Sequence, residues 1–128
     1  MTTAADKRLY IGYIVVAVLM ALMMFFSAAM KFLLNPEAVH VINEVVGVPM
    51  SLIAVLGICE VAGGLGLLAG IVRPKLGVAG GVGLVLYFLG AILAHVRVGD
   101  WAGVTAPITP LLLSCIALTL AILRMRRA

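Results

Sequence analysis

The apolar positions of this chain fall into four long stretches, separated by short segments that hold most of the charged residues. The stretches cover residues of about 10–34, 50–72, 76–96 and 107–123. A helix needs about 20 apolar residues to cross the hydrocarbon core of a bilayer, with some variation in length. The pattern predicts an all-α protein, in which residues 1–128 form one domain, an antiparallel bundle of four transmembrane helices.

Composition leads to the same class of protein. Of the 128 residues, 65% are hydrophobic and 11% are charged, and the mean hydropathy is +1.28. A soluble domain of this length cannot bury so much apolar surface, so we expect an integral membrane protein. The first stretch is longer than the roughly 7–15-residue core of a signal peptide, and we expect it to be a retained helix.

The basic residues predict an orientation. With the N-terminus inside, seven of the nine Lys and Arg residues fall on the cytoplasmic side, and only Lys31 and Arg97 lie near the outer side. We therefore expect both termini to be cytoplasmic (N-in, C-in). The net charge of +4 then reflects topology and contact with anionic lipids, and it gives no reason to expect nucleic-acid binding.

The segment between the first two stretches predicts a short amphipathic interfacial helix on the outer surface. Asn35 and Pro36 suit its start, polar residues recur at helical spacing over residues 37–46, and Gly47 with Pro49 ends it. Two interpretations are open for this helix: a lid over a pocket, or a plain connector at the interface.

The second and third stretches carry glycines at spacings that let helices pack closely. Gly66 with Gly70 and Gly77 with Gly81 are small-xxx-small pairs on either side of a tight turn. A hairpin within the chain and a homo-oligomer would both use such faces, and of the two we expect the hairpin.

Glu60 lies at the centre of the second stretch. A carboxylate in hydrocarbon costs roughly 2.5–3.5 kcal/mol or more, so Glu60 is expected to face the protein interior and to find a partner there. Gly63 and Gly64 share its face of the helix, and His95 lies above the glycine face of the third stretch. If the glycine faces meet, Glu60 and His95 both point inward.

Depth in the membrane suggests further members of the site. Tyr87 lies at about the depth of Glu60, and its hydroxyl is a candidate hydrogen-bond partner for the carboxylate. Lys31 either bends inward over Ser27 or extends outward into the headgroups. We predict an outward-facing polar pocket in which Lys31, Glu60, Tyr87 and His95 bind a ligand. The alternatives are a snorkelling lysine, an interfacial histidine bonded to backbone and a tyrosine that only packs.

The sequence holds no visible redox or metal motif. Cys59 and Cys115 form no CxxC pattern, and we expect both to be small buried residues of the core. The two histidines lie in different segments, which does not suit a bis-histidine haem. We assign no metal ligand, no catalytic residue and no intrinsic cofactor, so any redox chemistry requires a bound molecule such as a quinone.

Several short motifs follow one another in a recognisable order. They are Lys31-Phe32, Pro36, Gly47-Val48-Pro49, Gly57, Glu60, Gly64, Arg73, Gly90-Ala91 and His95-Val96-Arg97. From about Arg8 to Leu123, their order and spacing resemble the DoxX-like family of small four-helix bacterial membrane proteins. In that family the Lys, Glu and His positions of the first three helices recur, and they fall on Lys31, Glu60 and His95.

The resemblance implies a multi-pass protein of the bacterial cytoplasmic (inner) membrane, and a membrane subunit of a redox-linked complex that binds a quinone or another lipophilic molecule. The family takes its name from the membrane part of a thiosulfate:quinone oxidoreductase, and relatives are linked to complexes with sulfurtransferase and superoxide dismutase. The expected partners are the lipid bilayer and membrane or peripheral redox proteins, and a homo-oligomer stays open. Any enzymatic role would be that of a quinone-linked oxidoreductase subunit without its own redox centre.

Two other functions stay open. The chain is then either a non-enzymatic accessory or assembly factor for other membrane proteins, or a small proton-coupled exporter. Small multidrug transporters also have four helices and one membrane glutamate, but they show little charge bias and carry the glutamate in the first helix. We therefore rank the exporter third.

Overall fold

Four long helices make up most of the computed structural model, which describes residues 3–128. They are α1 (Ala4–Phe32), α3 (Met50–Ala69), α4 (Pro74–Arg97) and α5 (Thr105–Arg127). Between α1 and α3 lie one short helix, α2 (Pro36–Val39), and a π-helical segment, η1 (His40–Val45). Each long helix is long and apolar enough to cross a membrane. The predicted fold class is confirmed, and the chain is an integral membrane protein.

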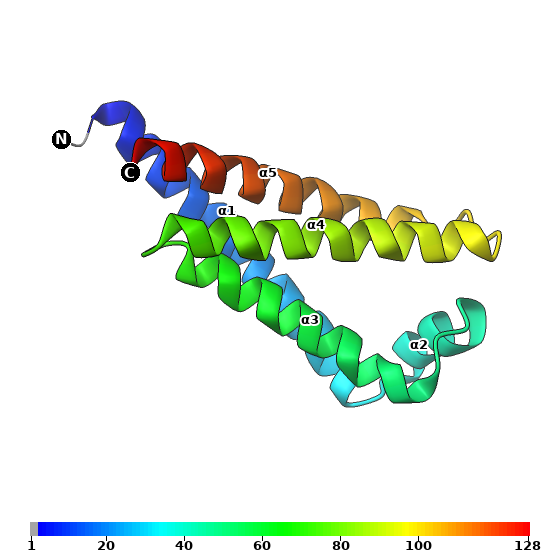
Figure 1. Cartoon of the computed structure of the whole chain (residues 1–128). Coiled ribbons are helices and arrows are strands. Elements are labelled where there is room, and N and C mark those ends of the chain that lie inside the picture. The colour runs from blue at the N-terminus through cyan, green and yellow to red at the C-terminus, as the bar shows by residue number, and fades with distance from the viewer. Residues whose placement is uncertain (1–2) are drawn as a thin grey trace.

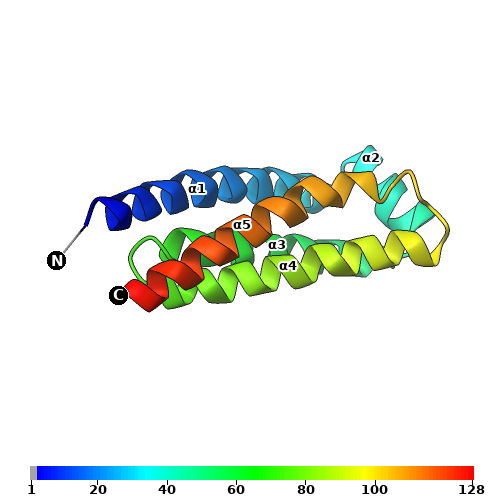
Figure 2. The same cartoon turned by 90° about the horizontal axis from the view of Figure 1, so that it is seen from above.

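The long helices run antiparallel and pack in a ring. α1 packs on α3, α3 on α4, α4 on α5, and α5 returns to α1. Figures 1 and 2 show both termini at one end of the bundle, here called the terminal end, and α2 at the other. The opposite end, which holds α2, η1 and the turn between α4 and α5, is called the open end. Termini at a common end are what the predicted N-in, C-in topology requires.

Some helix limits differ from the predicted spans, because hydropathy reports the apolar part of a helix and not its caps. α1 begins before residue 10, since Thr3 and Asp6 form a capping box: the Asp6 amide donates to Thr3 Oγ1 (3.0 Å) and the Thr3 amide to Asp6 Oδ2 (3.1 Å). α1 ends at Phe32, just before Leu34 adopts a φ of 51°. α5 begins at Thr105 and continues to Arg127, beyond both predicted limits.

The connection between α1 and α3 starts and stops where it was predicted. Asn35 Oδ1 accepts hydrogen bonds from the amides of Glu37 (3.0 Å) and Ala38 (3.4 Å), and Pro36 occupies the first turn. Gly47, with a φ of 88°, ends η1. The predicted single helix is instead one α-helical turn followed by the π-helical segment.

Glycine contacts hold α3 and α4 together at the terminal end, which confirms the predicted hairpin. A Cβ added to Gly66 would lie 2.9 Å from Gly80 Cα, and one added to Gly80 would lie 2.8 Å from the Leu67 amide nitrogen. Gly70 and Gly77 approach each other in the same way. The two backbones are therefore in direct contact, with no room for a side chain between them.

Arg124 and Tyr13 tie three helices together at the terminal end. Arg124 donates to the carbonyls of Gly70 (2.6 Å) and Ile71 (3.0 Å), just past the end of α3, and its guanidinium lies over the rings of Tyr10 and Tyr13. Tyr13 Oη donates to the Leu67 carbonyl (2.5 Å). A cation at this position satisfies the last carbonyls of a helix. Arg124, which sequence analysis treated only as a topology signal, thus has a structural role.

Toward the open end the helices separate into two pairs. Figure 1 shows α1 with α3 diverging from α4 with α5, and α2 lying at the far end of the first pair.

One prediction about the surface is wrong: Cys59 and Cys115 are both exposed on the outside of the bundle. Cys59 directly precedes Glu60, and because Glu60 points inward, its neighbour along the helix is turned away from the interior.

Candidate functional site

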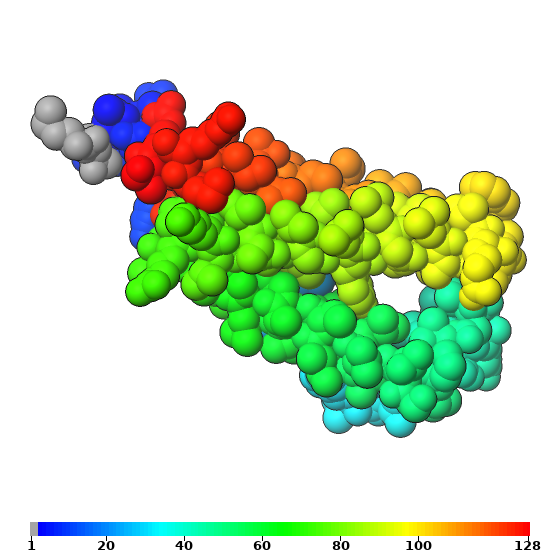
Figure 3. Space-filling model, viewed as in Figure 1, coloured from blue at the N-terminus to red at the C-terminus, as the bar shows by residue number. Residues whose placement is uncertain are grey.

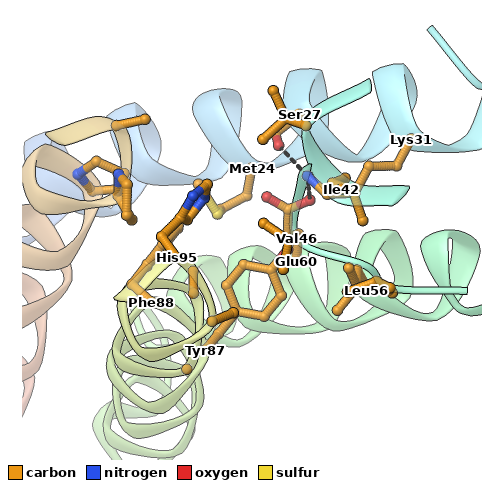
Figure 4. Close-up of a pocket in the computed structure, with 18 of the residues that line it drawn as sticks. Met24, Ser27, Lys31, Ile42, Val46, Leu56, Glu60, Tyr87, Phe88 and His95 are labelled. Carbon is orange, nitrogen blue, oxygen red and sulfur yellow. Dashed lines mark hydrogen bonds and ion pairs between the residues drawn. The ribbon is translucent and has the colours of Figure 1, made fainter. Parts of the chain in front are cut away.

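A cavity of about 500 Å³ lies between the two helix pairs in the open half of the bundle. Its walls come from α1, α3, α4, α5 and η1, and most of its lining side chains are apolar. Lys31, Glu60, Tyr87 and His95, the four residues predicted as a pocket, all line it. Figure 4 shows side chains from these helices converging on one space. Size, apolar walls and a few polar groups are typical of small-molecule sites.

Glu60 and Lys31 form an ion pair inside this cavity. Lys31 Nζ lies 2.7 Å from Glu60 Oε1 and donates to Ser27 Oγ at 2.8 Å (Figure 4). Glu60 is only 1% exposed. Of the two predicted paths for Lys31, the inward one over Ser27 is correct. The flexible four-carbon stem of lysine lets an ammonium near the outer boundary reach down to a carboxylate at mid-depth.

The ion pair leaves hydrogen-bonding capacity unused. Glu60 Oε1 is buried and has no hydrogen-bond partner among residues 3–128, so its contact with Lys31 Nζ is a charge attraction outside hydrogen-bond geometry. Tyr87, the predicted partner, donates no hydrogen bond to this oxygen. A carboxylate has about four acceptor positions and an ammonium has three donors. The pair is therefore held mainly by charge attraction, and part of the hydrogen-bonding capacity of the carboxylate is unused.

Aromatic rings from α4 form the wall beside the ion pair. Tyr87 and Phe88 lie edge to face, with ring centroids 5.1 Å apart and planes at 88°. Figure 4 shows both side chains reaching from α4 toward the space occupied by Glu60. Such rings offer a flat apolar surface on which a planar ligand can pack.

His95 is held by an acid that sequence analysis missed. His95 Nδ1 lies 2.9 Å from Asp100 Oδ2, and the histidine is buried against the cavity as predicted. An ionised carboxylate only accepts, so this contact places a proton on His95 Nδ1 and orients the ring. The Gly103 amide donates to Asp100 Oδ1 (3.1 Å), which fixes the carboxylate in turn.

The turn that ends α4 places Asp100 over His95. Gly99 has a φ of 74°. The Asp100 amide donates to the His95 carbonyl (2.9 Å), and the Gly99 amide donates to the Val96 carbonyl (3.0 Å). This is the Schellman arrangement, in which the second residue past a helix end folds back over its last turn. A glycine shortly after the last turn of the predicted helix was the available signal for this pairing.

The open end of the cavity is covered by η1. Val41, Ile42 and Val46 contribute to the cavity wall, and Arg97 Nη2 donates to the Val46 carbonyl (3.0 Å). This bond joins the end of α4 to the end of η1. The predicted pocket therefore lies in the expected half of the bundle, but Figure 3 shows its hollow on the side of the molecule, between α3 and α4, and not at the tip.

The site contains acid–base groups and no metal cluster. Within the described part of the chain, no group of three or more His, Cys, Asp or Glu residues is placed to hold a metal ion. The polar groups present can form hydrogen bonds with a bound molecule and can exchange protons with it.

Comparison with known protein families gives a match that covers most of the chain. The model of the DoxX-like family matches residues 15–117, which include Lys31, Glu60, Tyr87, His95 and Asp100. Searches among curated proteins and among solved structures found no match. The family match covers most of the chain, and the four apolar helices agree with it: the protein belongs to the DoxX-like family.

Proposed function

We propose that this protein binds a quinone, or another lipophilic molecule with a polar headgroup, as the membrane subunit of a redox-linked complex. The observation that carries the proposal is the Lys31–Glu60 ion pair inside a largely apolar cavity. Burying two charges in a membrane protein is unfavourable unless the pair is well partnered, and such residues commonly mark a functional site.

The pair offers complementary chemistry to a quinone headgroup. The ammonium of Lys31 can donate to a carbonyl oxygen, and the Glu60 carboxylate can accept from a hydroxyl. The same two groups can therefore hold an oxidised carbonyl form and a reduced hydroxyl form. Tyr87 and Phe88 provide the aromatic wall for a planar ring. When bound, a quinone supplies two-electron, two-proton redox chemistry, and electrons would come from a partner protein, since the chain shows no redox motif.

Glu60→Gln is expected to lower the quinone retained by the purified protein by about tenfold or more. It removes the charged acceptor and leaves the Lys31 ammonium without its counter-charge. The measurement is quinone per protein chain, by extraction and mass spectrometry after purification from native membranes. Cys59→Ala, which alters the exposed neighbour on α3, is the matched control and should retain wild-type quinone.

Tyr87→Phe separates ligand binding from folding. It removes one hydroxyl, keeps the aromatic wall, and is expected to lower quinone retention by a few-fold at an unchanged unfolding temperature. Wild-type protein that purifies without any bound lipophilic molecule, and takes up none when a quinone is added, would contradict the proposal.

The accessory-factor alternative loses part of its support. Glycine-rich helix faces are a means by which an accessory factor could bind partner helices, but Gly66, Gly70, Gly77 and Gly80 are in contact with one another within the chain. Native mass spectrometry from membranes distinguishes the two functions, because it detects bound small molecules and partner subunits in the same spectrum.

A further inference from the structure

The wall of the cavity continues onto the outer surface of the bundle. Leu86 lines the cavity and is nevertheless 63% exposed. Gly90, about one turn further along α4, also lines the cavity, and a Cβ added there would have no atom within 4 Å. Leu56 lies in the same wall on α3. We call the gap bordered by Leu56, Leu86 and Gly90 the side opening, and Figure 3 shows it as a hollow between α3 and α4.

The side opening follows from the packing of α3 on α4. At the terminal end the glycine contacts bring the two backbones together, and Leu84 still packs directly on Gly63, where a Cβ would lie 2.5 Å from Leu84 Cγ. Beyond Leu84, the large side chains of Tyr87 and Phe88 occupy the inner face of α4, and the helices diverge. Close contact in one half and separation in the other leave an opening between α3 and α4.

The side opening lies at the depth of the acyl chains. Gly90 comes sixteen residues after Pro74 and seven before Arg97, which places it about 24 Å from one end of α4 and about 10 Å from the other. The helix is about 36 Å long, and the hydrocarbon core is about 30 Å thick. The open end of the bundle does not offer such an entrance. There η1 covers the cavity, and the hydrogen bond from Arg97 to the Val46 carbonyl joins η1 to α4.

The chemistry of the edges differs from that of the interior. Leu56, Leu86 and Gly90 present no charge, whereas Lys31 and Glu60 lie deeper, between α1 and α3. A molecule crossing the side opening therefore needs an apolar portion that stays in the hydrocarbon and a polar portion that can leave it. An uncharged headgroup on a long hydrocarbon chain meets both conditions, since a charged headgroup would lose its hydration on this path.

We propose that the ligand enters from within the bilayer through the side opening, so that its headgroup reaches Lys31 and Glu60 while its hydrocarbon tail stays between α3 and α4. This inference rests on the proposed function and narrows the ligand to amphiphiles with uncharged headgroups and tails too long for the cavity, such as isoprenoid quinones. The tail lies against Gly90, where the absence of a side chain leaves space.

Gly90→Trp tests this path, because its Cβ would meet no atom within 4 Å and its large side chain would obstruct the side opening. Gly83→Trp is the matched control: it is two turns away on the same face of α4, and a Cβ there also has no atom within 4 Å. Each variant and the wild type are placed in lipid nanodiscs with two ubiquinones, one with a single isoprenoid unit and one with eight. Quinone bound per protein chain is counted by native mass spectrometry of protein released from the nanodisc, which excludes quinone dissolved in the lipid, across a range of quinone concentrations.

The expected result is that Gly90→Trp weakens binding of the long-tailed quinone by about tenfold or more, leaves the short-tailed quinone within about threefold of wild type, and that Gly83→Trp changes neither. Equal weakening for both tails, or no weakening for either, would overturn the path. If the wild type binds neither quinone, the proposed function fails, and the inference fails with it. The unfolding temperature of each variant checks that the fold is intact. Gly90→Leu, a smaller obstruction at the same position, is measured in the same way.

Discussion

Lys31→Met is expected to lower the free energy of unfolding by about 3–5 kcal/mol, because it leaves the Glu60 carboxylate buried without its counter-charge. The side chains of the pair are only 12% and 2% exposed, so water does little to compensate. Equilibrium unfolding in mixed micelles with rising SDS measures the change. Lys75→Met, which removes an exposed lysine near the start of α4, is the control and should have little effect.

The double variant Lys31→Met with Glu60→Leu sharpens this result. An apolar pair of similar volume removes both charges, and stability is expected to return to the wild-type value or above it. The protein would then be stable but unable to bind the headgroup, which separates the contribution of the ion pair to folding from its contribution to function. A double variant less stable than Lys31→Met would show that Glu60 has another stabilising partner.

Gly80→Ala is expected to destabilise the bundle by about 1–3 kcal/mol or more, since its Cβ would meet backbone atoms that cannot turn aside. These are the Leu67 amide nitrogen at 2.8 Å and the Gly63 carbonyl oxygen at 2.9 Å. The two helices would have to move apart along the whole glycine contact. The same SDS unfolding measurement applies.

Gly83→Ala is the natural comparison, three residues further along the same helix, where a Cβ meets nothing within 4 Å. Alanine there is expected to be neutral or slightly stabilising, because it favours the helix without creating a clash. Equal effects of the two substitutions would mean that α3 and α4 are not held by backbone contact.

The fold and most of the cavity could be predicted from the sequence because both depend on periodicity along single helices. Four apolar stretches predicted four helices, and helical spacing placed Glu60 and His95 on inward faces. The pairing of side chains was harder to predict. Lys31 starts near the outer boundary and Glu60 lies at mid-depth, yet the long side chain of Lys31 brings its ammonium to the carboxylate. Counting residues along a helix gives the depth of the backbone and does not include the reach of a side chain.

Features that depend on turns or on the angle between helices were missed. Asp100 reaches His95 only because the turn at Gly99 folds back, and the side opening exists only because the two helix pairs diverge. Cys59 and Cys115 were misplaced because hydrophobicity does not distinguish a core position from a lipid-facing one in a membrane protein.

The guanidinium of Arg124, bound to the two carbonyls past the end of α3, fixes the terminal end of the bundle, and the glycine contacts of α3 with α4 lie in the same half. Breathing motions that admit a headgroup would then be confined to the opposite half. A soluble partner docked at the terminal end would then meet the same surface whether the cavity is full or empty. Hydrogen exchange with and without added quinone checks this: protection should rise in η1 and the outer turns of α4, and amides around residues 66–80 should not respond.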